Sequence, residues 1–242
     1  MTRPPLMSRI FYMARLAVRL HGFRLPLVLV QRTWLYLKLR CLAPKTFEFS
    51  GKTYHCHFRP YSLDNERAAE IALAEDFLKG QRGEILEVGN VLSHYLNFQH
   101  DVVDKYEQAP GVINEDIVTY APGKKYDCIM SVSTLEHVGW DEQPRDPQKI
   151  IQAIQHLKTL LKDGAALFVT MPLGYNPHVD EMIRTRQTGF PEAGYLLRIS
   201  ADNGWREASW EEVQTAKYAT PFPCANALFV GIFRQPSGNP RA

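Results

Sequence analysis

Short apolar runs in the middle of the chain end in polar residues that could bind a small molecule. Glu87 and Gly89 close the run at 84–89, and Asp104 and Asp116 follow the next two runs. A carboxylate can accept hydrogen bonds from two neighbouring hydroxyl groups, and such charge-assisted bonds are strong. Glycine lets the backbone approach a ligand closely because it has no side chain. The spacing therefore predicts a ligand site built from the ends of successive strands.

Two histidines that could exchange protons follow the later apolar runs. His137 comes soon after the run at 126–132, and His178 follows the next run. Histidine changes its charge near neutral pH, so both are candidate general bases, with Tyr175 as an orienting group. For His137 the alternative is a structural role, in which Glu136 and His137 cap or pack against the next segment.

The apolar runs themselves predict the strands of a parallel sheet. They lack strict alternation, which is typical of strands that are buried on both faces. The predicted strands cover residues 84–89, 101–104, 111–114, 126–132, 165–171, 194–199 and 226–234. Because helices alternate with the first of these strands, the pattern indicates a doubly wound α/β sheet. Ligands bind such sheets at the carboxyl ends of the strands.

Capping residues and turn signals predict the remaining elements. Asp64–Lys79 is predicted as a helix with Asp64 as its N-cap, and Pro147–Lys162 as a helix capped by Asp146. Residues 46–58 are expected to form a hairpin that turns at Ser50–Gly51.

The series of strand ends resembles the class I S-adenosylmethionine-dependent methyltransferases over residues 65–233. The resemblance is closest to a group with a Leu-Glu-His-Val signature, which here is Leu135-Glu136-His137-Val138. It implies a Rossmann-like sheet, mostly parallel with an antiparallel last strand. It also implies S-adenosyl-L-methionine as cofactor and a small-molecule, glycan or lipid-linked methyl acceptor.

The resemblance also implies roles for the residues at the strand ends. In that family the first loop approaches the methionine part of the cofactor, an acid after the second strand binds the ribose hydroxyls, and an Asp after the third contacts the adenine amino group. By position, the cofactor-binding candidates are Glu87, Gly89, Asn90, Asp104, Lys105, Asp116, Ile117 and Ser131. For Glu87 the alternative is a structural acid that binds backbone amides.

The sequence departs from the family in the first loop and in the connections that follow it. Residues 89–93 hold one glycine where the family has G-x-G-x-G. Asn90 could take a left-handed conformation at low cost, whereas Val91 could not. About eleven residues separate the first two strands, so the helix between them must be short, and the connection after Lys105 is expected to be hardly helical. These departures leave open a protein that kept the fold and lost the activity.

The charges are distributed unevenly along the chain. Residues 1–45 hold nine Lys and Arg and no Asp or Glu, which leaves 28−9 = 19 basic against 26 acidic residues in 46–242. We expect a basic apolar segment at 1–45 and the methyltransferase domain at 46–242. The segment contains no apolar stretch long enough for a transmembrane span. It is expected to cover the domain or a partner, to rest on an anionic membrane surface, or to act as an organellar targeting peptide.

Other classes of function have weaker support in the sequence. The four cysteines lack C-x-x-C spacing, so we expect a cytoplasmic protein without a metal site. The main domain shows no nucleic-acid-binding motif. Tyr120 and Lys124 have the spacing of a pair used by nicotinamide-dependent enzymes, but Pro122 and Gly123 make a helix there implausible. The sequence does not predict the oligomeric state.

Overall fold

The computed structural model describes residues 45–59 and 62–238, together with Val30 and Thr33. The expectations for the basic segment at 1–45 therefore fall almost wholly outside the described residues. The division of the chain at residue 45 stays a prediction. No helix in the described part of the chain is long and apolar enough to cross a membrane.

An eight-stranded sheet forms the centre of the structure, with strand order β5-β4-β3-β6-β7-β10-β8-β9. The strands are β3 (Ile85–Val88), β4 (Asp101–Val103), β5 (Val112–Ile113), β6 (Tyr126–Val132), β7 (Leu161–Pro172), β8 (Glu192–Arg198), β9 (Trp205–Ala208) and β10 (Ala227–Arg234). All pairs from β5 to β7 are parallel, whereas β10 runs antiparallel to both β7 and β8. The predicted doubly wound, mostly parallel sheet with an antiparallel last strand is confirmed.

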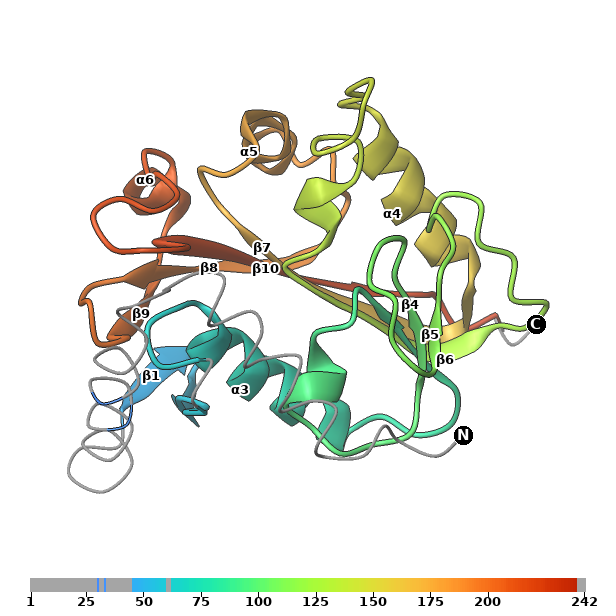
Figure 1. Ribbon diagram of the computed structural model, residues 1–242, viewed down its shortest axis with the longest axis horizontal. Coiled ribbons are helices and arrows are strands. Elements are labelled where there is room, and N and C mark those ends of the chain that lie inside the picture. The colour runs from blue at the N-terminus through green and yellow to red at the C-terminus, as the bar shows by residue number, and fades with distance from the viewer. Residues whose placement is uncertain (1–29, 31–32, 34–44, 60–61, 239–242) are drawn as a thin grey trace.

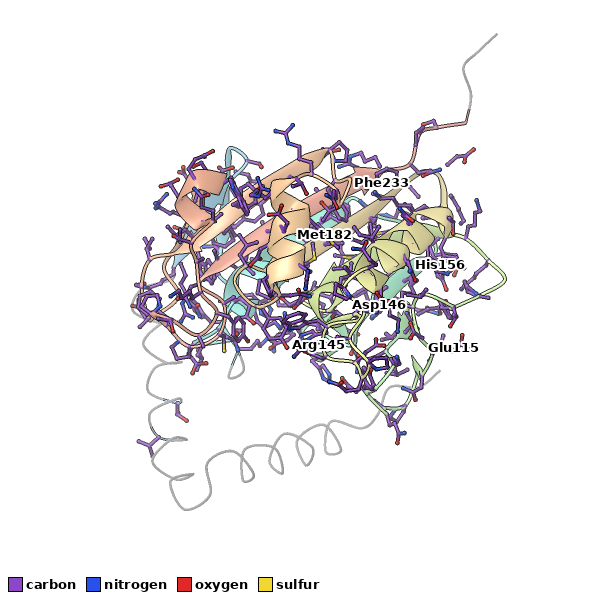
Figure 2. All side chains as sticks on the ribbon, turned by 90° about the horizontal axis from the view of Figure 1, so that it is seen from above. Glu115, Arg145, Asp146, His156, Met182 and Phe233 are labelled. Atoms are coloured by element: carbon purple, nitrogen blue, oxygen red, sulfur yellow. The ribbon has the colours of Figure 1, made fainter. Side chains whose placement is uncertain are left out.

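Helices cover both faces of this sheet. The helix α3 (Arg67–Lys79) lies on one face, and α4 (Lys149–Thr159) and α5 (Pro177–Arg184) lie on the other (Figure 1). Figure 2 looks onto the second face, with His156 labelled on α4 and Met182 on α5. Each helix buries an apolar stripe against the sheet, so two separate cores hold the strand ends in place.

The predicted hairpin is present at the N-terminal end of the described domain. It consists of β1 (Thr46–Phe49) and β2 (Lys52–His55), and its two turn residues have φ values of 49° at Ser50 and 72° at Gly51. The backbone N–H of Ser50 donates to Glu207 Oε2 of β9 at 3.0 Å. The hairpin therefore lies against the edge of the sheet.

The first predicted helix begins three residues later than expected. Glu66 is the N-cap and makes no side-chain capping bond, while Asn65 Oδ1 accepts the N–H of Arg67 at 3.1 Å just before the helix. The carbonyl of Asp64 accepts a hydrogen bond from the buried guanidinium of Arg198 at the end of β8. Asp64 is therefore not the N-cap that the sequence predicted.

The second predicted helix is shorter than expected at both ends. The predicted N-cap Asp146 is wrong: the helix begins at Lys149 with Gln148 as its N-cap, and Asp146 Oδ1 accepts the N–H of Gln148 at 3.0 Å in the turn before it. The helix ends at Thr159 because Leu161 already pairs with Tyr126 in the sheet.

Four short elements were not predicted: β9, the 3₁₀-helix η3 (Leu135–His137), α5 and α6 (Trp210–Val213). The short connections between the first strands were predicted. The connection from β3 to β4 holds one 3₁₀-helix, η2 (Leu92–His94), and no helix joins β4 to β5, as the short spacing indicated. The expected left-handed conformation of Asn90 is wrong, since the positive φ of this loop belongs to Gly89, at 83°.

Candidate cofactor-binding cleft

A cleft of about 1730 Å³ opens at the carboxyl ends of β3, β4, β5 and β6. The chain leaves β3 toward β4 on one side and returns to β6 on the other, so this is the point where the strand order reverses. Ligands bind doubly wound sheets at such switch points because the loops on the two sides diverge there.

The cleft brings most of the sequence-predicted residues together. Its lining includes Gly89, Asn90, Asp104, Lys105, Asp116, Ile117 and His137. Glu87, Ser131 and His178 are not among the residues that line it. The two predicted carboxylates that follow β4 and β5 therefore share one hollow.

Gly89 allows the loop after β3 to pass against the loop after β6. A Cβ atom at this position would collide with Thr134 Oγ1 and would lie 2.7 Å from Thr134 Cγ2. Its φ of 83° adds a second requirement for glycine. The single glycine of this loop is therefore required both by the positive φ and by the close approach to Thr134.

Asp104 ties the loop after β4 to the loop after β3. Its Oδ1 accepts the backbone N–H groups of Tyr106 and Glu107, both at 2.8 Å. Its Oδ2 accepts the N–H of Asn90 at 3.2 Å, and the Asn90 amide donates to Glu107 Oε1 at 2.7 Å. Two carboxylates, Asp104 and Glu107, therefore stand together at this edge of the cleft.

A cluster of four charges borders the cleft at Asp116. Asp116 Oδ2 lies 2.9 Å from Lys105 Nζ and 2.6 Å from Lys149 Nζ, and both lysines also contact Glu142. Burial alone would raise the pKa of Asp116, but the hydrogen bonds from Lys149 and Lys105 lower it to about 2. Asp116 is therefore an ionised hydrogen-bond acceptor at neutral pH.

Glu87 lies below the cleft, with its carboxylate engaged by the protein itself. Its Oε1 accepts the N–H groups of Val91, at 2.7 Å, and Leu92, and its Oε2 lies 2.7 Å from His100 Nε2. The side chain is completely buried. This placement favours the structural interpretation, in which Glu87 shapes the loop after β3 from beneath.

Ser131 and His178 also lie away from the cleft lining. Ser131 is buried within β6 and donates to the carbonyl of Val88 at 3.2 Å. His178 is an exposed residue in the first turn of α5, and its ring centroid lies 5.6 Å from that of Trp140. Asn176 caps this helix by accepting the His178 N–H at 3.0 Å.

His137 lies in the cleft wall and is held by a carboxylate. Its Nδ1 is 2.5 Å from Asp141 Oδ2, and the hydroxyl of Tyr175 donates to that same oxygen at 2.7 Å. Its Nε2 lies 3.6 Å from Glu136 Oε1. A carboxylate on one ring nitrogen fixes the orientation of the imidazole, so the other nitrogen can exchange a proton.

The sequence reasoning missed several residues of this cleft. Glu107, Glu142 and Thr134 line the cleft, and Thr134 makes the contact that requires Gly89. Lys149 does not line the cleft, but it binds Asp116 from the start of α4. The charge spacing of Asp104 and Glu107 was the one visible hint, because both follow the same short strand.

Tyr120 and Lys124, the pair with the spacing used by nicotinamide-dependent enzymes, lie outside the cleft lining. In the described ranges, no three His, Cys, Asp or Glu side chains come close enough to hold a metal ion. Tyr120 bonds the hydroxyl of Tyr126 at 3.1 Å, while Lys124 pairs with Glu84 and Asp101. Tyr120 and Lys124 therefore do not meet as a catalytic pair in the cleft.

Comparison with known proteins gives likenesses in structure only. No model of a protein family matches the sequence, and no curated protein matches it. Similar solved structures include the N-methyltransferase NodS from Bradyrhizobium japonicum WM9 in complex with S-adenosyl-L-homocysteine, with a TM-score of 0.48 and 17% identity. That match covers 74% of this chain and 92% of NodS.

Two further solved structures show likenesses at lower scores. A SAM-dependent methyltransferase from Archaeoglobus fulgidus has a TM-score of 0.42 and 13% identity, covering 69% of this chain and 92% of that one. The sugar N-methyltransferase KedS8 from Streptoalloteichus has a TM-score of 0.38 and 14% identity, covering 69% and 88%. Likenesses at these values carry no conclusion about activity, and the fold assignment rests on the observed strand order.

Proposed function

We propose that this protein is a methyltransferase that uses S-adenosyl-L-methionine to methylate a small-molecule or glycan acceptor. What supports the proposal is the shared cleft at the switch point of the sheet, with ionisable acceptors after β4 and β5 and a close-packed glycine after β3. Its volume of about 1730 Å³ exceeds the roughly 300–1,000 Å³ of common ligand pockets, so a nucleoside and an acceptor fit together.

The residues around Asp116 suit the edge of an adenine base. An adenine edge presents an amino donor beside a ring-nitrogen acceptor. Asp116 supplies an ionised acceptor, and the adjacent N–H of Ile117 donates to none of the described residues. The neighbouring Lys105 and Lys149 would hold the carboxylate in place beside the base.

The residues around Asp104 suit a sugar with two neighbouring hydroxyls. Asp104 uses three acceptor positions on backbone amides and keeps one on Oδ2, so a diol would need a second acceptor nearby. Glu107 would supply it, since its Oε1 accepts from the side-chain amide of Asn90, the residue whose backbone N–H donates to Asp104. We therefore extend the proposed ribose site from Asp104 to both carboxylates.

The cofactor supplies an electrophilic methyl group, and the protein supplies orientation. Methyl transfer is an in-line displacement, so its rate depends mainly on how the two reactants are held. His137, fixed by Asp141, is the candidate that would take a proton from a hydroxyl acceptor. His178 is exposed on α5, and a role in proton transfer would require the acceptor to extend toward Trp140.

Calorimetric titration with S-adenosylhomocysteine tests the proposal directly. We expect the wild type to bind with a micromolar dissociation constant. Asp116→Asn should bind about tenfold more weakly, because it loses one charge-assisted hydrogen bond. Asp202→Asn is the matched control, because Asp202 pairs with Lys45 and does not line the cleft. Absence of binding at millimolar ligand would contradict the proposal.

A catalytically inactive scaffold that kept this fold is the second candidate. The shortened connections of the first strands favour it, because η2 is the only helical turn between β3 and β4 in the described chain. A scaffold could still bind S-adenosylhomocysteine. Unlike an enzyme, it would not consume S-adenosylmethionine with any class of acceptor that is tested.

A lipid-linked acceptor at a cytoplasmic membrane surface is an extension of the same proposal. It rests on the nine basic and no acidic residues at 1–45, which lie almost entirely outside the described residues. A basic apolar segment binds anionic lipid headgroups by charge and apolar burial together.

A further inference from the structure

Three carboxylates are buried together behind the loop that follows β6. We call Glu66, Glu70 and Glu136 the acidic cluster; they are 7%, 0% and 1% exposed. Arg67 Nη1 lies 2.5 Å from Glu70 Oε2, and Arg198 lies within electrostatic reach of Glu66. Two arginines therefore serve three carboxylates among the described residues, and Glu136 has no salt-bridging Lys or Arg there.

Glu136 differs from the other two in having an oxygen without a partner. Glu66 Oε2 accepts a backbone N–H at 3.0 Å, and Glu70 Oε1 accepts the hydroxyl of Thr170 at 2.7 Å. Glu136 Oε2 is one of two buried side-chain polar atoms in the described chain without a hydrogen bond, and His57 Nδ1 is the other. Buried polar atoms are nearly always satisfied, so this oxygen marks a place where a donor is missing.

The electrostatics of the site favour a donor that carries positive charge. Burial raises the pKa of Glu136 well above its usual range, and the charges of Glu70 and Glu66 raise it further, while a backbone hydrogen bond and the charge of Arg67 oppose the shift. Burial likewise raises the pKa of Glu70. A bound cation would oppose both effects, because opposite charges stabilise the ionised form of a carboxyl group.

Two tyrosines, Tyr175 and Tyr218, lie within electrostatic reach of Glu136. The rings of Tyr175 and Tyr218 meet edge to face at 5.1 Å, and Tyr175 lies 4.9 Å from the ring of His137. Burial raises the pKa of both tyrosines, and the charge of Glu136 contributes to each. Aromatic rings next to a carboxylate are suited to an alkylammonium ion, which they attract through their faces.

Glu136 is next to the cleft in the chain, although it is not among the residues that line it. Its neighbours Thr134 and His137 line the cleft, whereas Glu136 itself is 1% exposed. The residues proposed to hold the nucleoside follow β4 and β5, whereas Glu136 and Tyr175 follow β6 and β7. The cluster is thus displaced from the nucleoside side toward the side where an acceptor would sit.

We propose that the acidic cluster binds the ammonium group of the methyl acceptor, so that the acceptor belongs to the amines. This inference rests on the proposed function. Glu136 Oε2 accepts the ammonium hydrogen bond, and the rings of Tyr175 and Tyr218 contact the adjoining carbon chain.

A matched pair of probes tests the charge preference of the site. Ligand-observed NMR compares n-butylammonium with n-butanol, with and without saturating S-adenosylhomocysteine. We expect the ammonium to bind at least about tenfold more tightly than the alcohol, and Glu136→Gln to remove most of that preference. Glu181→Gln is the control, since Glu181 is exposed on α5 and pairs with Arg184. Equal binding of the two probes by the wild type, or an unchanged preference in Glu136→Gln, would overturn the proposal.

A second titration separates the acceptor from the ammonium group of the cofactor itself. S-adenosylhomocysteine carries an ammonium group that methylthioadenosine lacks. We expect Glu136→Gln to leave the ratio of the two affinities unchanged. A fall of about tenfold in that ratio would assign the cluster to the cofactor and overturn the amine acceptor. Failure of the wild type to bind either nucleoside would instead contradict the proposed function, while the comparison of butylammonium with butanol without nucleoside would still decide the charge preference.

Discussion

At the scale of single residues, the clearest constraint in the cleft acts on Gly89. Replacing it with alanine imposes a φ of 83° on a side chain and drives the new methyl group into Thr134. We expect Gly89→Ala to destabilise the protein by about 2–4 kcal/mol, the sum of a left-handed penalty and an overpacking penalty. S-adenosylhomocysteine affinity should fall as well, because the loop after β3 must shift. Urea denaturation and calorimetry measure the two effects.

Gly123 provides the control for that substitution. It has a φ of 67°, but a Cβ atom there would meet nothing within 4 Å. Gly123→Ala should therefore cost only the backbone penalty of about 1–2 kcal/mol and leave ligand affinity unchanged. Equal losses of stability in the two variants would show that the contact with Thr134 contributes nothing.

The sequence predicted the hydrogen-bond-accepting carboxylates of the cleft better than it predicted the residues that bind them. Asp104 and Asp116 could be predicted because they end apolar runs, and strand ends converge in any parallel sheet. Lys149 and Glu142 could not, because Lys149 reaches Asp116 from the start of α4, and Glu142 binds Lys149 from the loop before that helix. Glu87 is the opposite case, since its position near the end of a strand was predicted correctly but its role was not. A side chain inside a strand points to one face of the sheet or the other, and the Glu87 carboxylate binds Val91 and His100 inside the protein.

At the scale of elements, one buried side chain holds several loops around the sheet. Arg198, at the end of β8, is 4% exposed and donates to the carbonyls of Asp64, Ser200, Ala201 and Pro223 at 2.7–3.2 Å. A lysine keeps the charge but lacks the rigid fork that reaches separate carbonyls. We expect Arg198→Lys to lower the free energy of unfolding by about 2–3 kcal/mol, as measured by urea denaturation.

An exposed arginine on α5 is the matched control for Arg198. Arg184 pairs with Glu181 on the surface, so Arg184→Lys should change the free energy of unfolding by less than about 0.5 kcal/mol. If both lysine variants had the same stability, the four carbonyl contacts would not organise the loops before α3 and after β8.

The elements that the sequence predicted best are those with the strongest local signals. Residues 126–132 were predicted with the bounds that β6 has, since a mainly apolar run of that length without strict alternation is typical of a central strand. The short strand β9 was missed because four residues at a sheet edge carry little pattern. The helix α5 had a readable signal, an Asn cap followed by Pro177 and an apolar stripe at Val179, Met182 and Ile183, which the turn-rich residues before it obscured.

At the scale of the whole molecule, the charge is divided between two parts of the chain. Residues 46–242 carry 26 acidic against 19 basic residues, and the positive balance of the protein comes from residues 1–45. An acidic domain is repelled by an anionic membrane, so any attraction must come from the basic segment. The basic segment is therefore attracted to an anionic membrane and the acidic domain is repelled by it. Vesicle binding measures which of the two effects is larger.

Arg15 and Arg19 lie four residues apart in the basic segment, on one face if that stretch is helical. Each basic residue near an anionic surface contributes about 1 kcal/mol, so replacing both with glutamate should weaken binding at least about thirtyfold. We expect the full chain to cosediment with vesicles containing phosphatidylserine, less so at high salt, and not with neutral phosphatidylcholine vesicles. The variant with both arginines replaced by glutamate should stay in the supernatant while binding S-adenosylhomocysteine normally. Equal cosedimentation of the wild type with neutral vesicles would contradict electrostatic binding, and no cosedimentation would assign the segment to contacts with protein.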